Sequence, residues 1–328
     1  MAALPDPRCP LDQRTAHETF ARILDGAVAE AELIAFLTGI AERDETSAEI
    51  AGAATAMRER MIPIAAPAGA IDVCGTGGDG AHSLNVSTAV AILVAAAGVP
   101  VAKHGNRAAS SKAGAADTLE AVGLDLDRAS DRAEASLNEI GLCFLFAQKH
   151  HPALKPLGPV RKRIGRRTIF NLLGPICNPA GVRRQLIGVA RPDFLPVYAG
   201  ALERIGCDAA MMVSGDEPLD ELSIGGPSSL IRLGAIGSGS ERFEPHTAGL
   251  PLHPLDAIRG GDAAYNGAAL SRLLAGEPGA YRDAVLLNAA AALIVAGKTG
   301  DWHHGVEIAA EAIDSGDARD LLARWIAF

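Results

Sequence analysis

The chain has 328 residues, 48% of them hydrophobic, which is enough for two domains with a large buried core. A formal charge of −9 and an aromatic content of 4% argue against non-specific nucleic-acid binding, which needs positive charge and stacking side chains. No apolar run reaches the roughly 18 residues of a membrane span, and residues 1–13 lack the basic and then apolar pattern of a secretory signal. Five dispersed cysteines without a metal-type spacing indicate a reduced, cytoplasmic protein.

The first 66 residues predict a small helical domain. Apolar residues recur at helical spacing over 16–24, 31–40 and 50–61, without any alternating stretch. Residues 63–69 form a linker with two prolines. This part carries no chemistry, but an apolar face on it would suit a dimer contact.

A glycine-rich loop follows at the start of the second domain, which we place at 70–328. Residues 71–74 read as a short strand, and the sequence then breaks into GTGGDG at 75–80. Glycines allow positive φ and let a ligand approach bare backbone N–H groups. The helix-cap types Asn85, Ser87 and Thr88 precede a buried helix over 89–98, and such a helix start is a ready anion site.

A second polar loop follows the next predicted strand, 99–102. It contains KHGNR at 103–107 and then SSK at 110–112, before a helix over 113–122. Both loops leave the ends of neighbouring strands in one βαβ unit. Together they predict a phosphate site with a fixed positive charge.

A dinucleotide site is the alternative for the first loop, because Gly75, Gly77 and Gly80 satisfy G-x-G-x-x-G. The context disagrees with it: the helix does not begin at the third glycine, and the second strand ends in Lys103 and His104 where an acid is expected. A glycine turn without any ligand would explain the first loop but not the second.

The segment from 140 to 192 has no acidic residue. Its basic residues are Lys149, Lys155, Arg161, Lys162, Arg163, Arg166, Arg167, Arg183, Arg184 and Arg191. Most of these are expected to form a solvated face, as charge runs usually do. A nucleic-acid surface would need aromatic residues interleaved with the arginines, and Phe170 is the one aromatic residue in that position. The segment could instead bind a small anion.

An acidic loop follows a predicted buried strand at 209–213. It carries Asp216, Glu217, Asp220 and Glu221. Alone, such a cluster is usually a solvated turn, but beside a phosphate site carboxylates call for a bridging hard cation. Residues 237–240 read as a flexible loop, 286–297 as a core helix, and the segment from His304 onward as one terminal helix. Alternating strands and helices from residue 70 predict an α/β domain with a mainly parallel sheet.

These motifs resemble those of the anthranilate phosphoribosyltransferases, and more loosely the pyrimidine nucleoside phosphorylases. They are GTGGDG (75–80), NVST (85–88), KHGNRAASS (103–111), HHPALK (150–155) with Val160-Arg161, RTIFNLLGP (167–175) and DELS (220–223). The resemblance extends over nearly the whole chain. It implies a small helical domain, with helices from about 152–175 as candidates to join it, and a larger α/β domain with the active site in the cleft between them.

The resemblance also implies the reaction: transfer of the 5-phosphoribosyl group of phosphoribosyl pyrophosphate to the amine of anthranilate, in tryptophan biosynthesis. It implies a cytoplasmic homodimer, formed through the helical domain, that uses Mg²⁺, with two ions on the donor. The implied metal ligands are Ser87, Asp220 and Glu221, and the acceptor residues are Gly75, Asn106, His151, Arg161 and Pro175. The implied donor residues are Gly75, Gly78, Asp79, Ser83, Asn85, Val86, Ser87, Thr88, Lys103, His104, Gly105, Asn106, Arg107, Ala108, Ala109, Ser110, Ser111 and Ala115.

Two positions depart from the family pattern. Ala115 stands where a serine is usual, which removes a hydroxyl that could hold a phosphate, and Ser214 stands where a histidine is common. Both concern donor affinity rather than the reaction. The sequence contains no nucleophilic triad or zinc motif, and a neutral arylamine does not need a strong base. The barrier is therefore one of charge and positioning, with His104 read as a positioning residue and His151 as either a tunnel or a hinge residue.

Overall fold

A seven-stranded sheet lies at the centre of this computed structural model, which describes residues 3–108, 111–217 and 219–328. The strands are β1 (Ile71–Gly75), β2 (Val101–Gly105), β3 (Leu142–Phe146), β4 (Arg184–Gly188), β5 (Ala209–Gly215), β6 (Ser228–Gly234) and β7 (Gly239–Phe243), in the order β3-β2-β1-β4-β5-β6-β7. All neighbouring pairs from β3 to β5 are parallel, and β6 and β7 are antiparallel additions. The predicted mainly parallel sheet is confirmed.

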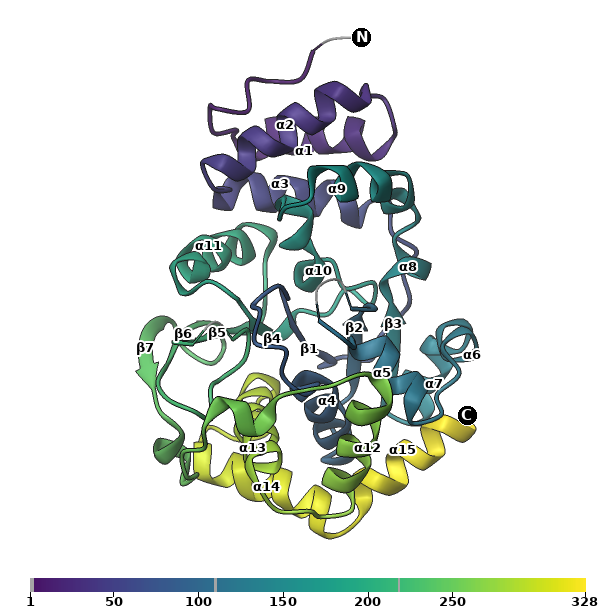
Figure 1. The fold of residues 1–328 in the computed structure, drawn as a ribbon, viewed down its shortest axis with the longest axis vertical. Coiled ribbons are helices and arrows are strands. Elements are labelled where there is room, and N and C mark those ends of the chain that lie inside the picture. Colours follow the sequence, from purple (N-terminus) through teal and green to yellow (C-terminus); the bar gives the residue numbers. More distant parts are fainter. Residues whose placement is uncertain (1–2, 109–110, 218) are drawn as a thin grey trace.

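Helices cover both faces of the sheet, so its central parallel strands are buried on both sides. In Figure 1, α4 and α12–α15 lie below the sheet, and α11 and the N-terminal helices lie above it. The helices of this larger part are α4 (Val86–Ala96), α5 (Ala115–Ala121), α6 (Leu126–Asp131), α7 (Ala133–Glu139), η3 (Pro192–Phe194), α11 (Leu195–Ile205), η4 (Pro245–Ala248), η5 (Leu255–Ile258), α12 (Ala263–Leu274), α13 (Ala280–Ala296), α14 (Trp302–Asp314) and α15 (Asp317–Ala327).

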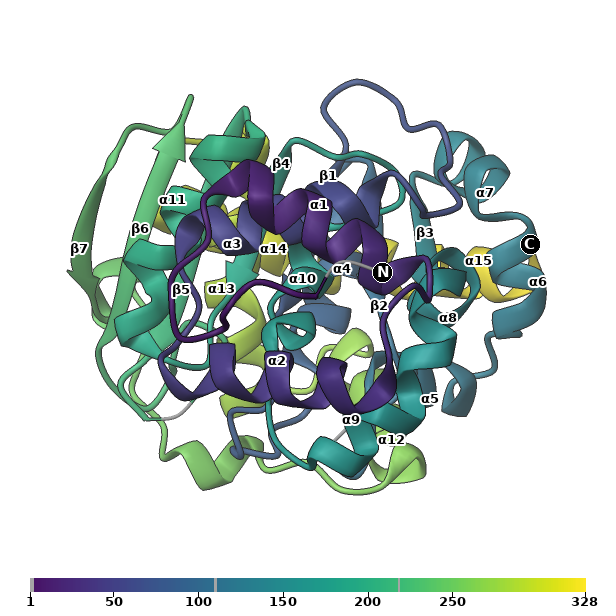
Figure 2. The same cartoon turned by 90° about the horizontal axis from the view of Figure 1, so that it is seen from above.

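The N-terminal part consists of α1 (Gln13–Leu24), α2 (Glu30–Glu42) and α3 (Ser47–Arg58). Thr46 begins α3 with a capping box, in which its hydroxyl accepts from the Glu49 N–H and the Glu49 carboxylate accepts from the Thr46 N–H. Figure 2 shows α1 and α2 above the rest of the chain. Their buried side chains belong to one core with Ile187 and Met212 of the sheet, and α3 packs on α11 and on α10 (Leu173–Ile176), which lie on that face of the sheet.

The segment between β3 and β4 joins the two parts. It contains α8 (Ala147–His150), η1 (Pro152–Leu157), α9 (Gly158–Ile164), η2 (Ile169–Asn171) and α10 (Leu173–Ile176). Helix α9 packs on α2, and α10 packs on α3, β1 and β2. Val160 and Phe170 lie in the same core as the N-terminal helices. The assignment of 152–175 to the helical domain, and the boundary between 66 and 70, remain predictions.

Three sequence expectations need correction. The terminal helix is two helices, because Gly316 takes a left-handed conformation (φ +86°) between α14 and α15. Residues 239 and 240 begin strand β7 and do not belong to a loop, and α13 begins at Ala280, six residues before the predicted start at 286. In the described parts of the chain, no helix is both long and apolar enough to cross a membrane.

Candidate active site

Glycines shape the loop after β1 in two ways. Gly77, Gly78 and Gly80 have φ of +68°, +77° and +78°, which residues with a side chain rarely adopt. Gly75 is required for space, because a Cβ there would lie 2.1 Å from Oδ2 of Asp220. The glycine run therefore allows both the turn and the close approach of the acidic loop.

The acidic loop closes over this glycine loop and over the first turn of α4. Oδ2 of Asp220 accepts from the Gly77 N–H at 2.7 Å, and the Asp220 N–H donates to Asp79 at 3.3 Å. Oε1 of Glu221 accepts from the Ser87 N–H at 3.1 Å. Residues separated by 134 and 143 positions in the sequence thus meet at one point.

The ionised forms of the Asp220 and Glu221 carboxylates are electrostatically disfavoured in this loop. Burial, followed by the charges of Asp79 and Glu221, raises the pKa of Asp220 well above its ordinary value. Burial also raises the pKa of Glu221 to about 7, against the opposing charge of Lys103. A cation beside them would relieve this cost.

The oxygen ligands of the acidic loop fit Mg²⁺. Within the described ranges, no group of three or more His, Cys, Asp or Glu side chains could hold a metal unaided. Magnesium does not need such a group, because it is usually bound by one or two carboxylates together with substrate phosphates and waters. Asp220 and Glu221, with the Ser87 hydroxyl nearby, match that mode.

Lys103 places a positive charge beneath the glycine loop. Its side chain is buried, and Nζ donates to the Val73 carbonyl at 2.7 Å and to the Ser87 hydroxyl at 3.2 Å. An ammonium has three N–H donors, and the third has no acceptor among the described residues. Lys103 can therefore stabilise negative charge at the first turn of α4.

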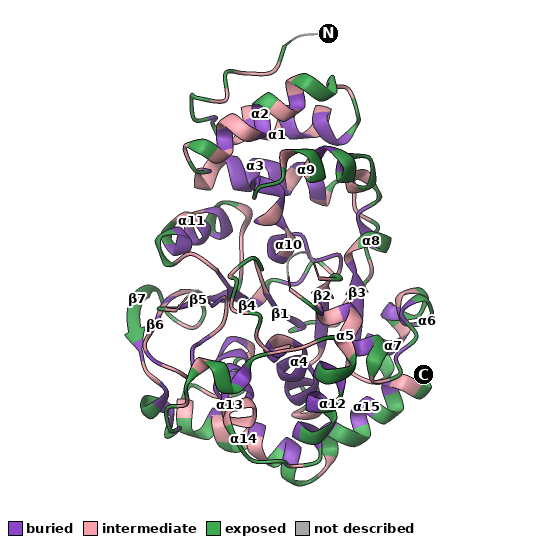
Figure 3. Ribbon diagram, in the orientation of Figure 1, coloured by how far each residue is buried: buried purple, intermediate pink, exposed green. Residues whose placement is uncertain are grey.

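Side chains link the carboxyl ends of β1 and β2. The two strands pair in register at Ile71 and Val101. Beyond that pair, Asp72 takes the place of a backbone acceptor: its Oδ1 accepts from the His104 N–H at 3.0 Å, and its Oδ2 accepts from Asn178 Nδ2 at 2.8 Å. Figure 3 shows how deeply these strands are buried.

His104 and His151 form a buried neutral pair. His104 Nδ1 lies 2.8 Å from the Gly174 carbonyl, which can only accept, so Nδ1 carries the proton. His104 Nε2 then accepts from His151 Nε2, 3.2 Å away. Burial, with the charge of His151 and then of His150 and Lys103, lowers the pKa of His104 to about 3, and burial and His150 lower that of His151 to about 4. Histidines with such low pKa values are poor general bases at neutral pH, so a positioning role fits them better than proton abstraction.

These pKa values predict acid sensitivity of the fold. The unfolded histidines have pKa near 6.5 and bind protons first, so the stabilisation is complete above pH 6.5 and is lost as the pH falls. Between pH 6.5 and 5, the loss for His104 and His151 together should reach roughly 4 kcal/mol. Asp220 and Glu221, whose pKa values are raised, gain stability over the same range as the pH falls, so the histidine contribution is measured as a difference between two proteins. Thermal unfolding from pH 7 to pH 5 should show a smaller acid-induced loss of stability in His104→Gln than in the unmodified protein, and an equal pH dependence in both would contradict the neutral pair.

The remaining predicted donor residues differ in how far they are exposed to solvent. Asn85 occupies the N-cap position of α4 without capping it, because its side chain bonds to Ala113, Asn266 and Thr118. Val86 and Thr88 are buried. The partly or fully exposed ones are Gly78, Asp79, Ser83, Gly105, Asn106, Arg107, Ala108, Ser111 and Ala115, and Ala109 and Ser110 lie outside the described residues.

Arg161 stands out among the basic residues of the acid-free segment. Most of the others contact carboxylates, a carbonyl or an aromatic ring: Lys149 with Asp127, Arg163 with Glu30, Arg166 with Glu42, Arg167 with Phe194, Arg183 with Asp208, Arg184 with Val295, and Arg191 with Asp44. Within the described residues, Lys155, Arg161 and Lys162 have no such side-chain partner, and only Arg161 of these three is partly buried. Burial without a counter-charge lowers its pKa, and a bound carboxylate would supply that counter-charge.

The structure adds three residues that sequence reasoning missed. A Cβ on Gly188, at the end of β4, would lie 1.5 Å from the Asp220 carbonyl oxygen, so the acidic loop needs a glycine there too. Asp72 and Asn178 hold the His104 backbone as described above. A charged residue inside an otherwise apolar strand is the one signal that could have indicated Asp72.

Comparison with known proteins places the chain in a family. A model described as "Glycosyl transferase family, a/b domain" matches residues 68–319, and one described as "Glycosyl transferase family, helical bundle domain" matches residues 7–61. An anthranilate phosphoribosyltransferase from Novosphingobium aromaticivorans is 62% identical over 327 residues, covering 100% of this chain and 99% of that protein. The chain belongs to the anthranilate phosphoribosyltransferases.

Solved structures of anthranilate phosphoribosyltransferases have the same fold. The Thermus thermophilus enzyme superposes with a TM-score of 0.93 at 42% identity, covering 98% of this chain and 96% of the other. The Saccharomyces cerevisiae enzyme, solved in complex with phosphoribosyl pyrophosphate and Mg, gives a TM-score of 0.88 at 27% identity, with 97% and 93% covered. The predicted helical domain and α/β domain are confirmed as the fold of this anthranilate phosphoribosyltransferase family.

Proposed function

We propose that the loops after β1, β2 and β5, with the first turn of α4, bind the phosphoribosyl donor in this chain. The reaction is the one that defines the family: transfer of the 5-phosphoribosyl group of phosphoribosyl pyrophosphate to the amine of anthranilate, which gives N-(5-phosphoribosyl)anthranilate and pyrophosphate in tryptophan biosynthesis. One observation carries the assignment of the site. Asp220 and Glu221 converge on the glycine loop and on Ser87, directly above the buried ammonium of Lys103.

The pyrophosphate would lie against residues 75–79 and 85–88. Bound Mg²⁺ neutralises charge on the leaving pyrophosphate, and we propose two ions held by Ser87, Asp220 and Glu221. Lys103 adds a fixed positive charge that costs no reorganisation when the leaving group departs. The loop 106–111 would take the 5-phosphate and the sugar.

Anthranilate would lie between this loop and the 150–175 segment. Arg161 would hold its carboxylate, with Asn106, Gly75, Pro175 and His151 around the ring. The amine is neutral at pH 7 and can attack the sugar without a strong base, so positioning supplies much of the catalysis. His104, neutral and bonded to Gly174 and His151, supports the geometry of this wall.

The activity is tested by the loss of anthranilate fluorescence when donor and Mg²⁺ are added. The signal should fall only when both are present. Release of a base from a nucleoside in the presence of phosphate would instead indicate a nucleoside phosphorylase.

Substitution of Ala115 by serine should increase the affinity for the phosphoribosyl donor. Ala115 is the first residue of α5, directly after the donor loop, and its side chain offers no hydrogen bond. Ala115→Ser should lower the KM for phosphoribosyl pyrophosphate by about tenfold or more, because a hydrogen bond to a charged group contributes about 1.5–3 kcal/mol. Initial rates at varied donor concentration measure it. An unchanged KM would mean that a water or a backbone N–H already fills this role.

We further propose a homodimer formed through the helical domain, and a cytoplasmic location. The dimer rests on the family resemblance. The location is supported by the five cysteines, all of which are free thiols, as expected in a reducing compartment.

A further inference from the structure

The Asp117 carboxylate links the two ends of the loop after β2. Oδ2 of Asp117 accepts from the N–H of Ala108 at 3.0 Å and from the N–H of Gly114 at 2.9 Å. The Ala116 N–H donates to the Asn106 carbonyl at 3.3 Å. A Cβ on Gly114 would lie 2.5 Å from the Ala108 nitrogen, so the two ends of the loop are in contact. Asp117 therefore fixes where the loop begins and ends.

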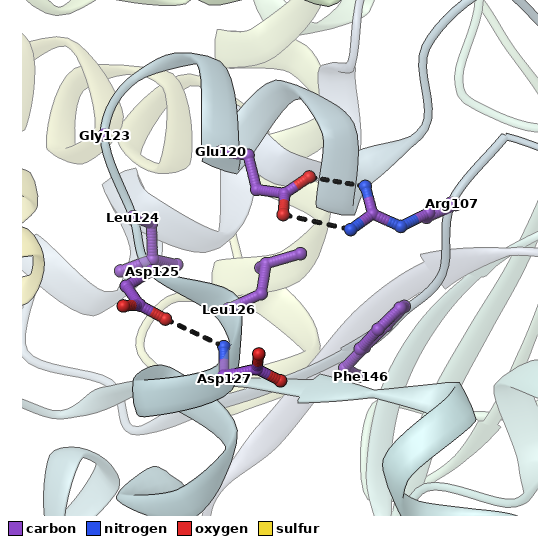
Figure 4. A pocket seen from close by; sticks show the side chains of 8 residues that line it. All are labelled: Arg107, Glu120, Gly123, Leu124, Asp125, Leu126, Asp127 and Phe146. Carbon is purple, nitrogen blue, oxygen red and sulfur yellow. Dashed lines mark hydrogen bonds and ion pairs between the residues drawn. The ribbon is translucent and has the colours of Figure 1, made fainter.

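Arg107 braces this carboxylate from outside the loop. Its Nη1 donates to Oδ1 of Asp117 at 2.8 Å and also contacts Glu120, and its Nη2 donates to Glu120 at 2.9 Å. The guanidinium lies 5.6 Å from the centre of the Phe146 ring. Figure 4 shows the Arg107 guanidinium directed at Glu120. Both residues line a cavity of about 380 Å³, which Leu124 also lines.

We propose that Arg107, Asp117 and Glu120 form a clamp that positions the donor loop. Arg107 acts through Asp117, because three of its five N–H donors already bond to the carboxylates of Asp117 and Glu120. The other two, on Nε and Nη2, are those that a direct contact with the donor would have to use. This inference rests on the assignment of the loop to donor binding. It changes the role of Arg107, which the family resemblance places among the donor-contacting residues.

The clamp should affect binding much more than stability. Its side chains are 21–42% exposed, and ion pairs at such sites stabilise a fold by little. A loop held in its bound shape, by contrast, avoids the ordering cost on binding. Loss of the clamp should raise the donor KM while leaving kcat and the anthranilate KM nearly unchanged.

A double-mutant cycle separates the clamp from direct contact. Arg107→Ala and Glu120→Ala should each raise the Kd of Mg–phosphoribosyl pyrophosphate, by up to about tenfold. The double variant should bind no more weakly than Arg107→Ala, because both substitutions break the same group of contacts. Amide exchange at Ala108 and Gly114 should speed up in all three variants. Arg272→Ala, which breaks the exposed ion pair between Arg272 at the end of α12 and Glu277 beyond it, is the matched control and should bind normally.

Each other outcome has a distinct meaning. If Glu120→Ala binds like the unmodified protein while Arg107→Ala binds weakly, Arg107 contacts the donor and the clamp is wrong. If all variants bind equally well, the clamp has no role in binding and is also wrong. If the unmodified protein fails to bind the donor, the assignment of the donor site is wrong.

Discussion

Chelation with EDTA should abolish phosphoribosyl transfer, and Mg²⁺ should restore it. A carboxylate about 4 Å from a phosphate oxygen is repelled by roughly 4 kcal/mol at an effective dielectric near 20. Asp220 and Glu221 already carry raised pKa values because burial and neighbouring acids oppose their charge. They can therefore help to bind a pyrophosphate only through a bridging cation. The loss of anthranilate fluorescence, followed as Mg²⁺ is titrated, measures this dependence.

Asp220→Asn tests whether the acidic pair of Asp220 and Glu221 is responsible for the dependence on Mg²⁺. The amide oxygen can still accept from the Gly77 N–H, so the loop should keep its shape while the charge is lost. The variant should need much more Mg²⁺ for half-maximal activity. Asp216→Asn is the matched control, because Asp216 lies in the same loop but pairs with Arg242. Full activity of Asp220→Asn at micromolar Mg²⁺ would remove the acidic pair from the site.

The loops could be predicted from the sequence because their signals are local. Glycine runs, short apolar strands and polar residues at strand ends all lie within a few positions of one another, and a βαβ unit places such ends at one edge of the sheet. The residue types of 75–80 and 103–107 are therefore sufficient to indicate a phosphate site. The family resemblance then adds the substrate.

Contacts between distant segments could not be predicted in this way. Asp72 meets Asn178 across 106 positions, and Gly188 matters only because the Asp220 backbone passes beside it. Neither has a periodicity or a motif. Likewise, the sequence showed ten basic residues in one segment, but their carboxylate partners lie on other elements, so only the fold separates Arg161 from the rest.

Arg161→Ala should raise the KM for anthranilate by about tenfold or more, since a hydrogen bond to a charged group contributes about 1.5–3 kcal/mol. A planar guanidinium can hold a carboxylate through two parallel hydrogen bonds, which lysine cannot. Arg161 is partly buried and has no counter-charge among the described residues, so a bound carboxylate would relieve its desolvation. Steady-state kinetics with each substrate varied in turn measure the effect.

The donor KM decides between two roles for Arg161. If it binds the acceptor, the donor KM should stay nearly unchanged, because in the proposed site phosphoribosyl pyrophosphate would contact the loops at 75–88 and 103–111 instead. Lys162→Ala is the matched control: it removes a neighbouring positive charge that is exposed and also without a side-chain partner among the described residues, and it should leave both KM values unchanged. If Arg161→Ala raises the donor KM and not the anthranilate KM, Arg161 is a phosphate ligand. The carboxylate of anthranilate would then have to lie against a different part of the 150–175 segment.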